Sequence, residues 1–314
     1  MPQHSHARGV QLSLLCLLIL GLLPIIATLR NGEGNAMAFS FWLSFWQLVF
    51  AVPVYLLQGR TPQPAPEAHA SKPHFSKGRT WALVLLTGTL FGAATFVYVL
   101  AVDRAGPVTF AVAVQAYPLF AVVWEAFFLK RRKSMAEIGL MLVIAAAMVY
   151  LGTQGTWQLS AITGGFWLAL VVPLLWSIAH VIIKEMMNAS AITPSEVIVT
   201  RVLIATVLLG AASVWNQGLD GLVATATAPR FQGIAFLMGC AYYLELLSWF
   251  YAVKLIDVSR GASITAPAPA LTLLISLAVL GQEVHGYQVV ALVLVVGSVI
   301  GLIHSGHRRA STTP

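Results

Sequence analysis

Apolar residues run along the chain in ten long blocks, and most of the charged side chains stand in the short stretches between them. A helix of about 17–25 apolar residues crosses the roughly 30 Å hydrocarbon core of a bilayer. Each block has that length, so we predict ten membrane-spanning helices. The predicted spans are 10–29, 36–57, 80–102, 106–129, 135–151, 162–183, 194–215, 231–253, 262–281 and 287–304.

The segments between these spans are too short and too polar to form a separate folded region. The longest one, the predicted flexible cytoplasmic loop 58–79, carries four prolines among scattered polar residues and cannot bury a core. The sequence contains no phosphate-binding loop and no zinc motif. We therefore expect an all-α integral membrane protein that needs no cofactor and no metal.

Composition supports a membrane protein and excludes a cytosolic enzyme. Hydrophobic residues make up 58% of the chain and charged residues 9%, against about 45–50% and 25% in soluble domains. Cys16 and Cys240 both lie inside apolar runs, where packing is the expected role and a disulfide or metal site is not.

The excess of basic residues predicts how the chain is oriented. The formal net charge is +7, and no mixed basic and aromatic face suits nucleic acid. Ten spans place both termini on one side. With the N-terminus inside, inner segments carry fourteen Lys and Arg residues and outer segments carry three. Because basic residues are retained on the cytoplasmic side, we expect both termini in the cytoplasm.

The two halves of the sequence echo each other. Asp103 closes the third predicted span as Asp257 closes the eighth, and Pro118 and Pro269 lie 151 residues apart. Residues 1–155 and 156–314 then form two repeats of five helices. Since five is odd, the second repeat is inverted in the membrane, an arrangement that in many transporters places the solute near the midplane.

Motifs in the second half resemble a known family. The stretch from Tyr251 to Asp257 is followed by Arg260-Gly-Ala-Ser263, then Pro267-Ala-Pro269, then Gly281-Gln-Glu283 and Gly297. This order is similar to the EamA repeat of the drug/metabolite transporter (DMT) superfamily. The resemblance implies a ten-helix carrier of the inner membrane, usually an exporter of amino acids, metabolites or drugs.

The first half departs from the family pattern at two places. Pro118 matches, but Lys130-Arg131-Arg132 stands where the family has Gly-Glu. Arg201 in the seventh span resembles an arginine of the family, whereas the second span has Gln47 near the corresponding position.

Two charges lie deep inside predicted spans. Arg201 is seven residues, and Glu245 eight, from the cytoplasmic ends of their spans, which at 1.5 Å per residue is roughly 10–12 Å. Such charges cost about 2.5–3.5 kcal/mol at the bilayer centre and need a reason. Arg201 could bind a solute carboxylate and Glu245 an amine; Glu245 could instead carry the coupling proton, or the two could form a structural ion pair.

Aromatic side chains accompany these charges. Trp42 and Trp46 share one helical face, and Tyr242 and Trp249 share another with Glu245. They are candidates for solute binding through ring stacking or cation–π contact, with plain packing as the alternative.

Three further polar side chains and three prolines are candidate site residues. His180 is a candidate for solute binding, or reaches only the membrane interface or a backbone carbonyl. Pro118, Pro267 and Pro269 are expected to open the backbone at a cavity or hinge. Gln115 and Tyr117, just before Pro118, could then contact the solute or only pack.

These observations predict a secondary transporter. It would export a small amphipathic, amino-acid-like metabolite across the inner membrane by alternating access, and the sequence leaves open whether transport is coupled to protons or to exchange. The alternative within this class is an exporter of lipophilic cations or drugs. An intramembrane enzyme or a channel is the alternative from another class. The expected partners are a small-molecule solute and the lipid bilayer; the sequence leaves monomer and homodimer open.

Overall fold

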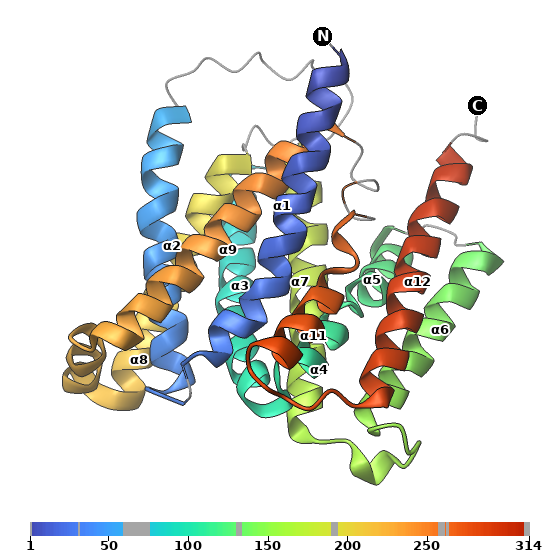
Figure 1. Ribbon diagram of the computed structural model, residues 1–314. Helices are drawn as coiled ribbons and strands as arrows, with labels where there is room; N and C mark the ends of the chain where they lie inside the picture. The colour runs from blue at the N-terminus through green and yellow to red at the C-terminus, as the bar shows by residue number, and fades with distance from the viewer. Residues whose placement is uncertain are drawn as a thin grey trace. The chain divides into compact units, whose positions relative to one another are not determined.

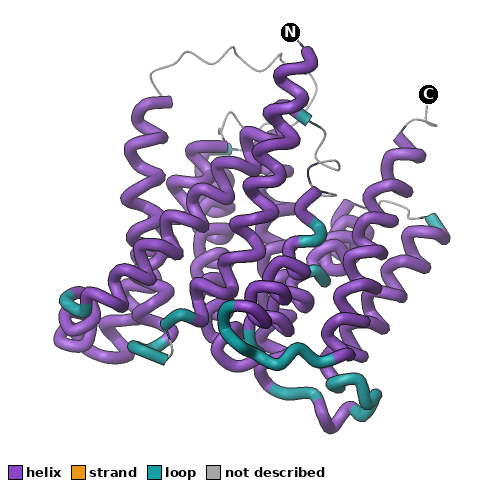
Figure 2. The backbone as a smooth tube through the Cα atoms, in the orientation of Figure 1, coloured by secondary structure: helices purple, strands orange, loops and turns teal. Residues whose placement is uncertain are grey.

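The computed structural model describes residues 2–30, 32–58, 76–129, 134–189, 194–256, 261 and 264–310. These ranges are helical almost throughout and contain no strand (Figures 1 and 2). The elements are α1 (Pro2–Thr28), α2 (Ala36–Gln58), α3 (Lys77–Ala105), α4 (Pro107–Val114), α5 (Tyr117–Leu129), α6 (Met135–Gly152), the 3₁₀ turn η1 (Leu159–Ala161), α7 (Gly164–Ala189), α8 (Pro194–Ala226), α9 (Pro229–Leu255), α11 (Ala268–Ala278) and α12 (Gly286–Ala310).

Every predicted span contains a helix, and seven helices in the described residues are long and apolar enough to cross a membrane. They cover 7–28, 36–57, 78–105, 135–152, 164–183, 195–226 and 229–249. Three apolar helices are shorter, at 107–121, 268–278 and 286–302. The chain is therefore an all-helical protein with several candidate spans. Most of the predicted loop 58–79 lies outside the described residues, as do Lys130-Arg131-Arg132 and Asp257.

The fourth predicted span is divided into two helices, and the ninth begins late. The helical pattern is interrupted at residues 115–116, just before Pro118, and again at 266–267, just before Pro269. A proline has no N–H to donate to the carbonyl four residues earlier, and its ring collides with that carbonyl. The expected opening of the backbone is therefore present at both prolines.

The seventh predicted span, 194–215, ends close to a kink in α8. The helical segment runs from Pro194 to Ala226, but it consists of two helices that meet at Gly218, with φ 73°. This left-handed conformation suits glycine, which has no Cβ to clash. The first helix therefore ends near the predicted position, and the second helix lies beyond the predicted span.

The chain forms two compact units, and each takes segments from both halves of the sequence. Unit 1 comprises residues 1–32, 97–174 and 244–314; unit 2 comprises 33–96 and 175–243. Helices α3, α7 and α9 each contribute to both units. The predicted division into 1–155 and 156–314 is a repeat in the sequence and stays a prediction.

In unit 1, α1 packs against α4 and α11, while α6 packs against α12. Gly21 permits the contact with α11, since a Cβ there would lie 2.8 Å from the Leu271 side chain. The Thr272 hydroxyl donates to the Gly21 carbonyl at 2.8 Å. At the end of α1, the buried Arg30 forms an ion pair with Asp103 of α3, a contact that the sequence analysis did not foresee.

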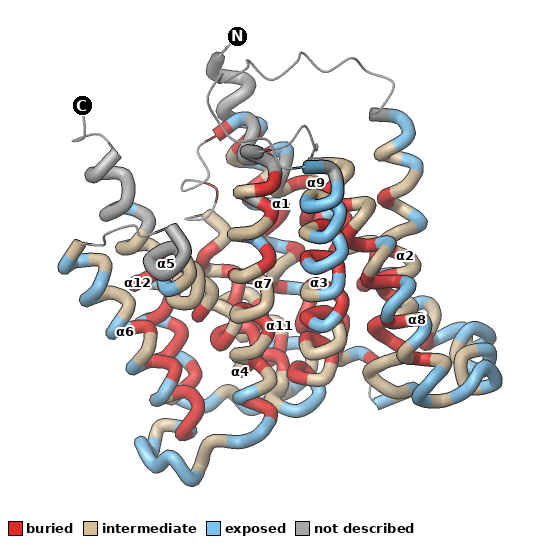
Figure 3. Tube along the Cα trace, turned by 180° about the vertical axis from the view of Figure 1, so that it is seen from behind, coloured by how far each residue is buried: buried red, intermediate tan, exposed pale blue. Residues whose placement is uncertain are grey.

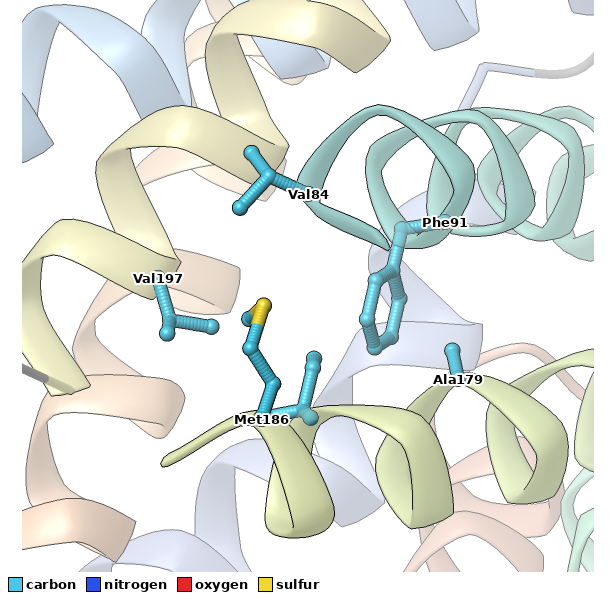
Figure 4. Packing of buried hydrophobic residues seen from close by; sticks show 6 residues of the cluster. Val84, Phe91, Ala179, Met186 and Val197 are labelled. Carbon is cyan, nitrogen blue, oxygen red and sulfur yellow. The ribbon is translucent and has the colours of Figure 1, made fainter. Parts of the chain in front are cut away.

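In unit 2, α2 packs along α8, and α3, α7 and α8 enclose an apolar cluster. Figure 4 shows Phe91 from α3 and Met186 from α7 among the labelled members. The cluster consists of Val84, Phe91, Ala179, Ile183, Met186 and Val197. Large apolar side chains such as Trp81 and Val207 stay exposed, and the exposed stretches of the helices are pale blue in Figure 3. Such exposure suits contact with lipid better than contact with water.

Candidate functional site

A small pocket lies inside unit 2, where four helices meet. It is lined by Ser44 and Gln47 of α2, Phe91 and Thr95 of α3, Arg201, Val202 and Ala205 of α8, and Tyr242 of α9. Its free space is enough for about one water molecule. Two of the predicted site residues, Arg201 and Tyr242, therefore line the same pocket. The free space in this pocket has the size of a single small polar group.

Two glycines bring the helices close together around this pocket. A Cβ at Gly92 would lie 3.2 Å from the Ala205 Cα, which places α3 against α8. A Cβ at Gly239 would lie 2.7 Å from the Leu43 carbonyl oxygen and 3.0 Å from the Gln47 backbone nitrogen, which places α9 against α2. Small residues at such crossings allow backbones to approach closely. The glycines thereby place Phe91, Gln47 and Tyr242 on the pocket wall.

Arg201 is buried, with 7% of its surface exposed. Its Cζ lies 4.1 Å from the centre of the Phe91 ring, a distance at which the ring face attracts a guanidinium. The contact compensates part of the cost of burying the charge. Phe91 was not among the predicted site residues, because an aromatic residue in an apolar span carries no distinguishing signal.

Ser44 and Gln47 supply polar groups beside this charge. Ser44 is 1% exposed and Gln47 is 5% exposed. Within the described residues, the Ser44 Oγ and the Gln47 Nε2 have no hydrogen-bond partner. Sequence reasoning placed Gln47 near the counterpart of Arg201 but did not include it in the site, and Ser44 and Thr95 were missed. A polar residue in an apolar span could have indicated these positions. Many such residues, however, donate a hydrogen bond to a carbonyl of their own helix, as Thr95 does to Phe91.

His180 of α7 lies near the same aromatic ring but does not line the pocket. Its ring centre is 5.3 Å from that of Phe91, in an edge-to-face arrangement, and its side chain is exposed. Phe91 is therefore in contact with both the predicted histidine and the predicted arginine. A role of His180 in solute binding stays a prediction.

Trp42 and Trp46 have partners away from the pocket. The Trp42 indole N–H donates to the Thr225 hydroxyl at 3.0 Å, and that of Trp46 donates to the Gln232 Oε1 at 2.9 Å. Gln232 in turn donates to the Thr225 carbonyl at 3.1 Å. These hydrogen bonds join α2 to the end of α8 and to the start of α9. They favour a packing role for both tryptophans.

The remaining predicted site residues belong to unit 1. Glu245 is buried, and its backbone carbonyl accepts a hydrogen bond from the Cys16 Sγ at 3.5 Å. Trp249 packs against Gly261, where a Cβ would lie 3.3 Å from the indole ring. The predicted pairing of Glu245 with Arg201 joins groups of different units and stays a prediction, as do the amine-binding and proton-coupling roles.

The broken helices of unit 1 contain the other candidates. Gln115 and Tyr117 flank the break before Pro118, and both are half-buried. Pro267 precedes α11 as its N-cap, and Pro269 is buried within its first turn. α4 and α11 pack against each other, so the two breaks belong to neighbouring helices. No group of three or more potential metal ligands occurs among the described residues.

Helices of this length and hydropathy, several of them apolar on their exposed faces, define a multi-pass membrane protein. Residues 163–303 match the EamA-like transporter family. This match is to a family of the DMT superfamily and agrees with the resemblance that the motifs of the second half indicated. The match to this family indicates that the chain is a membrane transporter of the DMT type.

Solved structures show a related fold. One crystal structure of a protein is 19% identical, covers 93% of this chain and 97% of its own, and has a TM-score of 0.57. In all, 28 chains of solved structures match. A search of curated proteins found no match.

Proposed function

We propose that this protein is a secondary transporter that exports a small amphipathic, amino-acid-like solute across the inner membrane. The observation that carries the proposal is Arg201, a buried cation that lines a pocket between apolar helices. A charged side chain inside a membrane span costs free energy, and such residues commonly have a functional role. A solute carboxylate would compensate the charge during transport, and the family match to transporters supports that use.

The proposed architecture is ten spans in two inverted repeats. Gly88 and Gly239 are 151 residues apart, as are Phe91 and Tyr242, and Pro118 and Pro269. Gly88 of α3 faces Ile204 of α8, where a Cβ would lie 2.7 Å away. Gly239 of α9 faces α2 in the same way. α3, the third predicted span, thus contacts α8, the seventh. α9, the eighth predicted span, contacts α2, the second. A two-fold axis that relates the two repeats would produce this reciprocal pairing. This relation supports alternating access between two repeats.

The energy source we propose is a proton gradient or exchange with a second solute. Glu245 is buried in a helix that is long and apolar enough to span the membrane. Carboxyl groups inside membrane spans are characteristic of proton pathways in transporters, which supports this role. The second candidate function, export of lipophilic cations, would use the same carboxylate together with Trp249.

Counterflow in proteoliposomes tests the proposal. Vesicles loaded with unlabelled leucine should accumulate radiolabelled leucine from outside, and Arg201→Ala should lower the initial rate at least tenfold. Arg230→Ala is the matched control, because Arg230 is an exposed arginine of unit 2 that pairs with Glu33. Normal counterflow by Arg201→Ala contradicts the proposed site.

Two further arms decide the solute class and the coupling. Counterflow of a lipophilic cation that depends on Glu245 but not on Arg201 would favour the second candidate function. If Glu245→Gln abolishes pH-driven export but keeps exchange, Glu245 is the coupling group. Ion conductance through a planar bilayer without saturable counterflow would instead indicate a channel.

A further inference from the structure

The pocket of unit 2 contains two buried polar atoms that have no hydrogen-bond partner in the described part of the chain. They are the Ser44 Oγ and the Gln47 Nε2, both on α2 and less than one turn apart. A buried polar group without a partner costs about 1–3 kcal/mol, and such groups are normally satisfied by protein, water or ligand. Two of them on the wall of one pocket indicate that something polar occupies it.

The chemistry of the pocket wall selects the occupant. The unsatisfied atom of Gln47 is the amide nitrogen, which only donates. Arg201, with its positive charge and five N–H donors, lines the same pocket. No Asp or Glu stands among the described residues that line it. A pocket with donors, a positive charge and no carboxylate is suited to an anion and not to a cation.

We propose that Ser44 and Gln47, together with Arg201, form a carboxylate-binding subsite that makes the transporter selective for solutes that carry a carboxylate group. The inference deepens the proposed function and rests on it for the role in transport. The free space of about one water molecule fits one small polar group rather than a whole solute. The rest of the solute would lie outside this pocket.

Each residue has a separate task in this subsite. Arg201 is held through the Phe91 ring and supplies the charge and a planar fork that matches two carboxylate oxygens. Gln47 supplies an additional N–H donor from the opposite helix, and Ser44 a hydroxyl one turn away. Gln47 is therefore a specificity-determining residue, because its neutral amide donates to a carboxylate oxygen and adds no negative charge to the pocket.

The test is ligand binding to the purified full-length protein in detergent, measured by the rise in unfolding temperature. The probes are acetate, chloride, L-leucine and L-leucinamide, where the last two differ in the carboxylate. We expect acetate and leucine to bind, and leucinamide to bind at least tenfold more weakly, since hydrogen bonds to charged groups are the strong ones. Equal binding of leucine and leucinamide overturns the proposal.

Variants at Gln47 decide whether this pocket is responsible. Gln47→Glu has nearly the same shape and places a carboxylate beside Arg201, so it should abolish the response to acetate and leucine without lowering the unfolding temperature of the unliganded protein. Gln47→Leu should weaken binding about tenfold. Ser213→Ala is the matched control, because Ser213 also has a buried Oγ without a partner in the described chain but lies outside the pocket.

The outcomes separate the subsite from the proposed function. Wild-type binding by Gln47→Glu overturns the subsite, even when the counterflow of leucine is normal. A response to chloride equal to that of acetate and leucine also overturns it, because the pocket would then be a site for any small anion. Carboxylate binding that Gln47→Glu abolishes, in a protein without counterflow, supports the subsite and contradicts the transport function.

Discussion

At the scale of single residues, glycines decide where the polar groups of the pocket stand. Gly239 lets α9 approach the backbone of α2 at Leu43 and Gln47. Three residues further along α9, Tyr242 reaches the pocket wall. The position of a pocket residue is thus set by a neighbour without a side chain, which is why a search for chemically active residues alone cannot reconstruct the site.

We predict that Gly239→Ala destabilises the protein by about 1–3 kcal/mol, the usual cost of overpacking. The new Cβ would lie 2.7 Å from the Leu43 carbonyl oxygen and from the Trp46 Cβ, and backbone at that distance cannot yield without separating the helices. The measurement is the unfolding temperature in detergent, together with the affinity for leucine, which should fall as Tyr242 moves.

Gly233→Ala is the control in the same helix. A Cβ there meets nothing within 4 Å, and alanine is the better helix former by up to about 1 kcal/mol. This variant should be as stable as the wild type or slightly more stable. Equal destabilisation by both substitutions would mean that the α2–α9 contact does not constrain the pocket.

The residues of the site differ in how far the sequence could predict them. Arg201 and Glu245 stand out because a charge in an apolar span needs a reason. Gln47 and Ser44 do not, since a hydroxyl or amide in a helix is often satisfied locally, as in Ser40 with the Ala36 carbonyl at 2.7 Å. Which polar group lacks a partner depends on the neighbouring helices, and a single sequence does not contain that information.

At the scale of helices, the breaks before Pro118 and Pro269 are the irregular features of unit 1. α4 ends at Val114 and α5 begins at Tyr117, so the second residue of α5 is the proline. The Leu119 and Phe120 amides both bond to the Ala116 carbonyl, at 3.0 and 3.3 Å. The second helix thus has a start of its own and is not a continuation of the first.

We predict that Pro118→Ala raises the unfolding temperature and lowers the transport rate. Alanine supplies the N–H that proline lacks and, in a continuous helix, is favoured over proline by about 3 kcal/mol, so α4 and α5 can join. If the break serves as a hinge, a continuous helix slows the conformational step and reduces kcat for leucine counterflow more than it changes KM.

Pro53→Ala is the comparison for this variant, because Pro53 lies within α2, which continues on both sides of it. Removing that proline should change stability without a matching fall in kcat. A hinge role for Pro118 fails if Pro118→Ala transports at the wild-type rate while the stability rises as expected.

Element boundaries show the limits of hydropathy. The apolar pattern located a helix in each of the ten predicted spans because helix length and bilayer thickness are linked. It did not show that the fourth span is two helices, because Gln115 and Ala116 interrupt the helix geometrically while apolar residues continue on both sides. It also did not predict the second helical part of α8, which follows the kink at Gly218 and continues to Ala226.

At the scale of the whole molecule, repeats in the sequence and units in space are different divisions. Unit 2 contains α2 and part of α3 from the first half, and α8 and parts of α7 and α9 from the second. The pocket takes side chains from both halves. Neither half alone could therefore form it.

Basic residues are distributed unequally between the predicted inner and outer segments, and this bias predicts the membrane topology. With fourteen basic residues in the predicted inner segments and three in the outer ones, we expect both termini in the cytoplasm. With this orientation the α2–α3 connection faces inwards, and the α6–α7 connection with η1 faces outwards. Ser76 and Ser160 are exposed residues in these two connections, so cysteines at these positions report the side directly.

The measurement is labelling of intact cells with a membrane-impermeant maleimide, in a background in which Cys16 and Cys240 are replaced by alanine. Ser160→Cys should be labelled in intact cells, and Ser76→Cys only after permeabilisation. The reversed pattern would mean that the charge bias does not orient this chain. Labelling of both in intact cells would contradict an odd number of spans between residues 76 and 160, and with it the inverted repeat, because α3, the α4–α5 pair and α6 would then cross the membrane an even number of times.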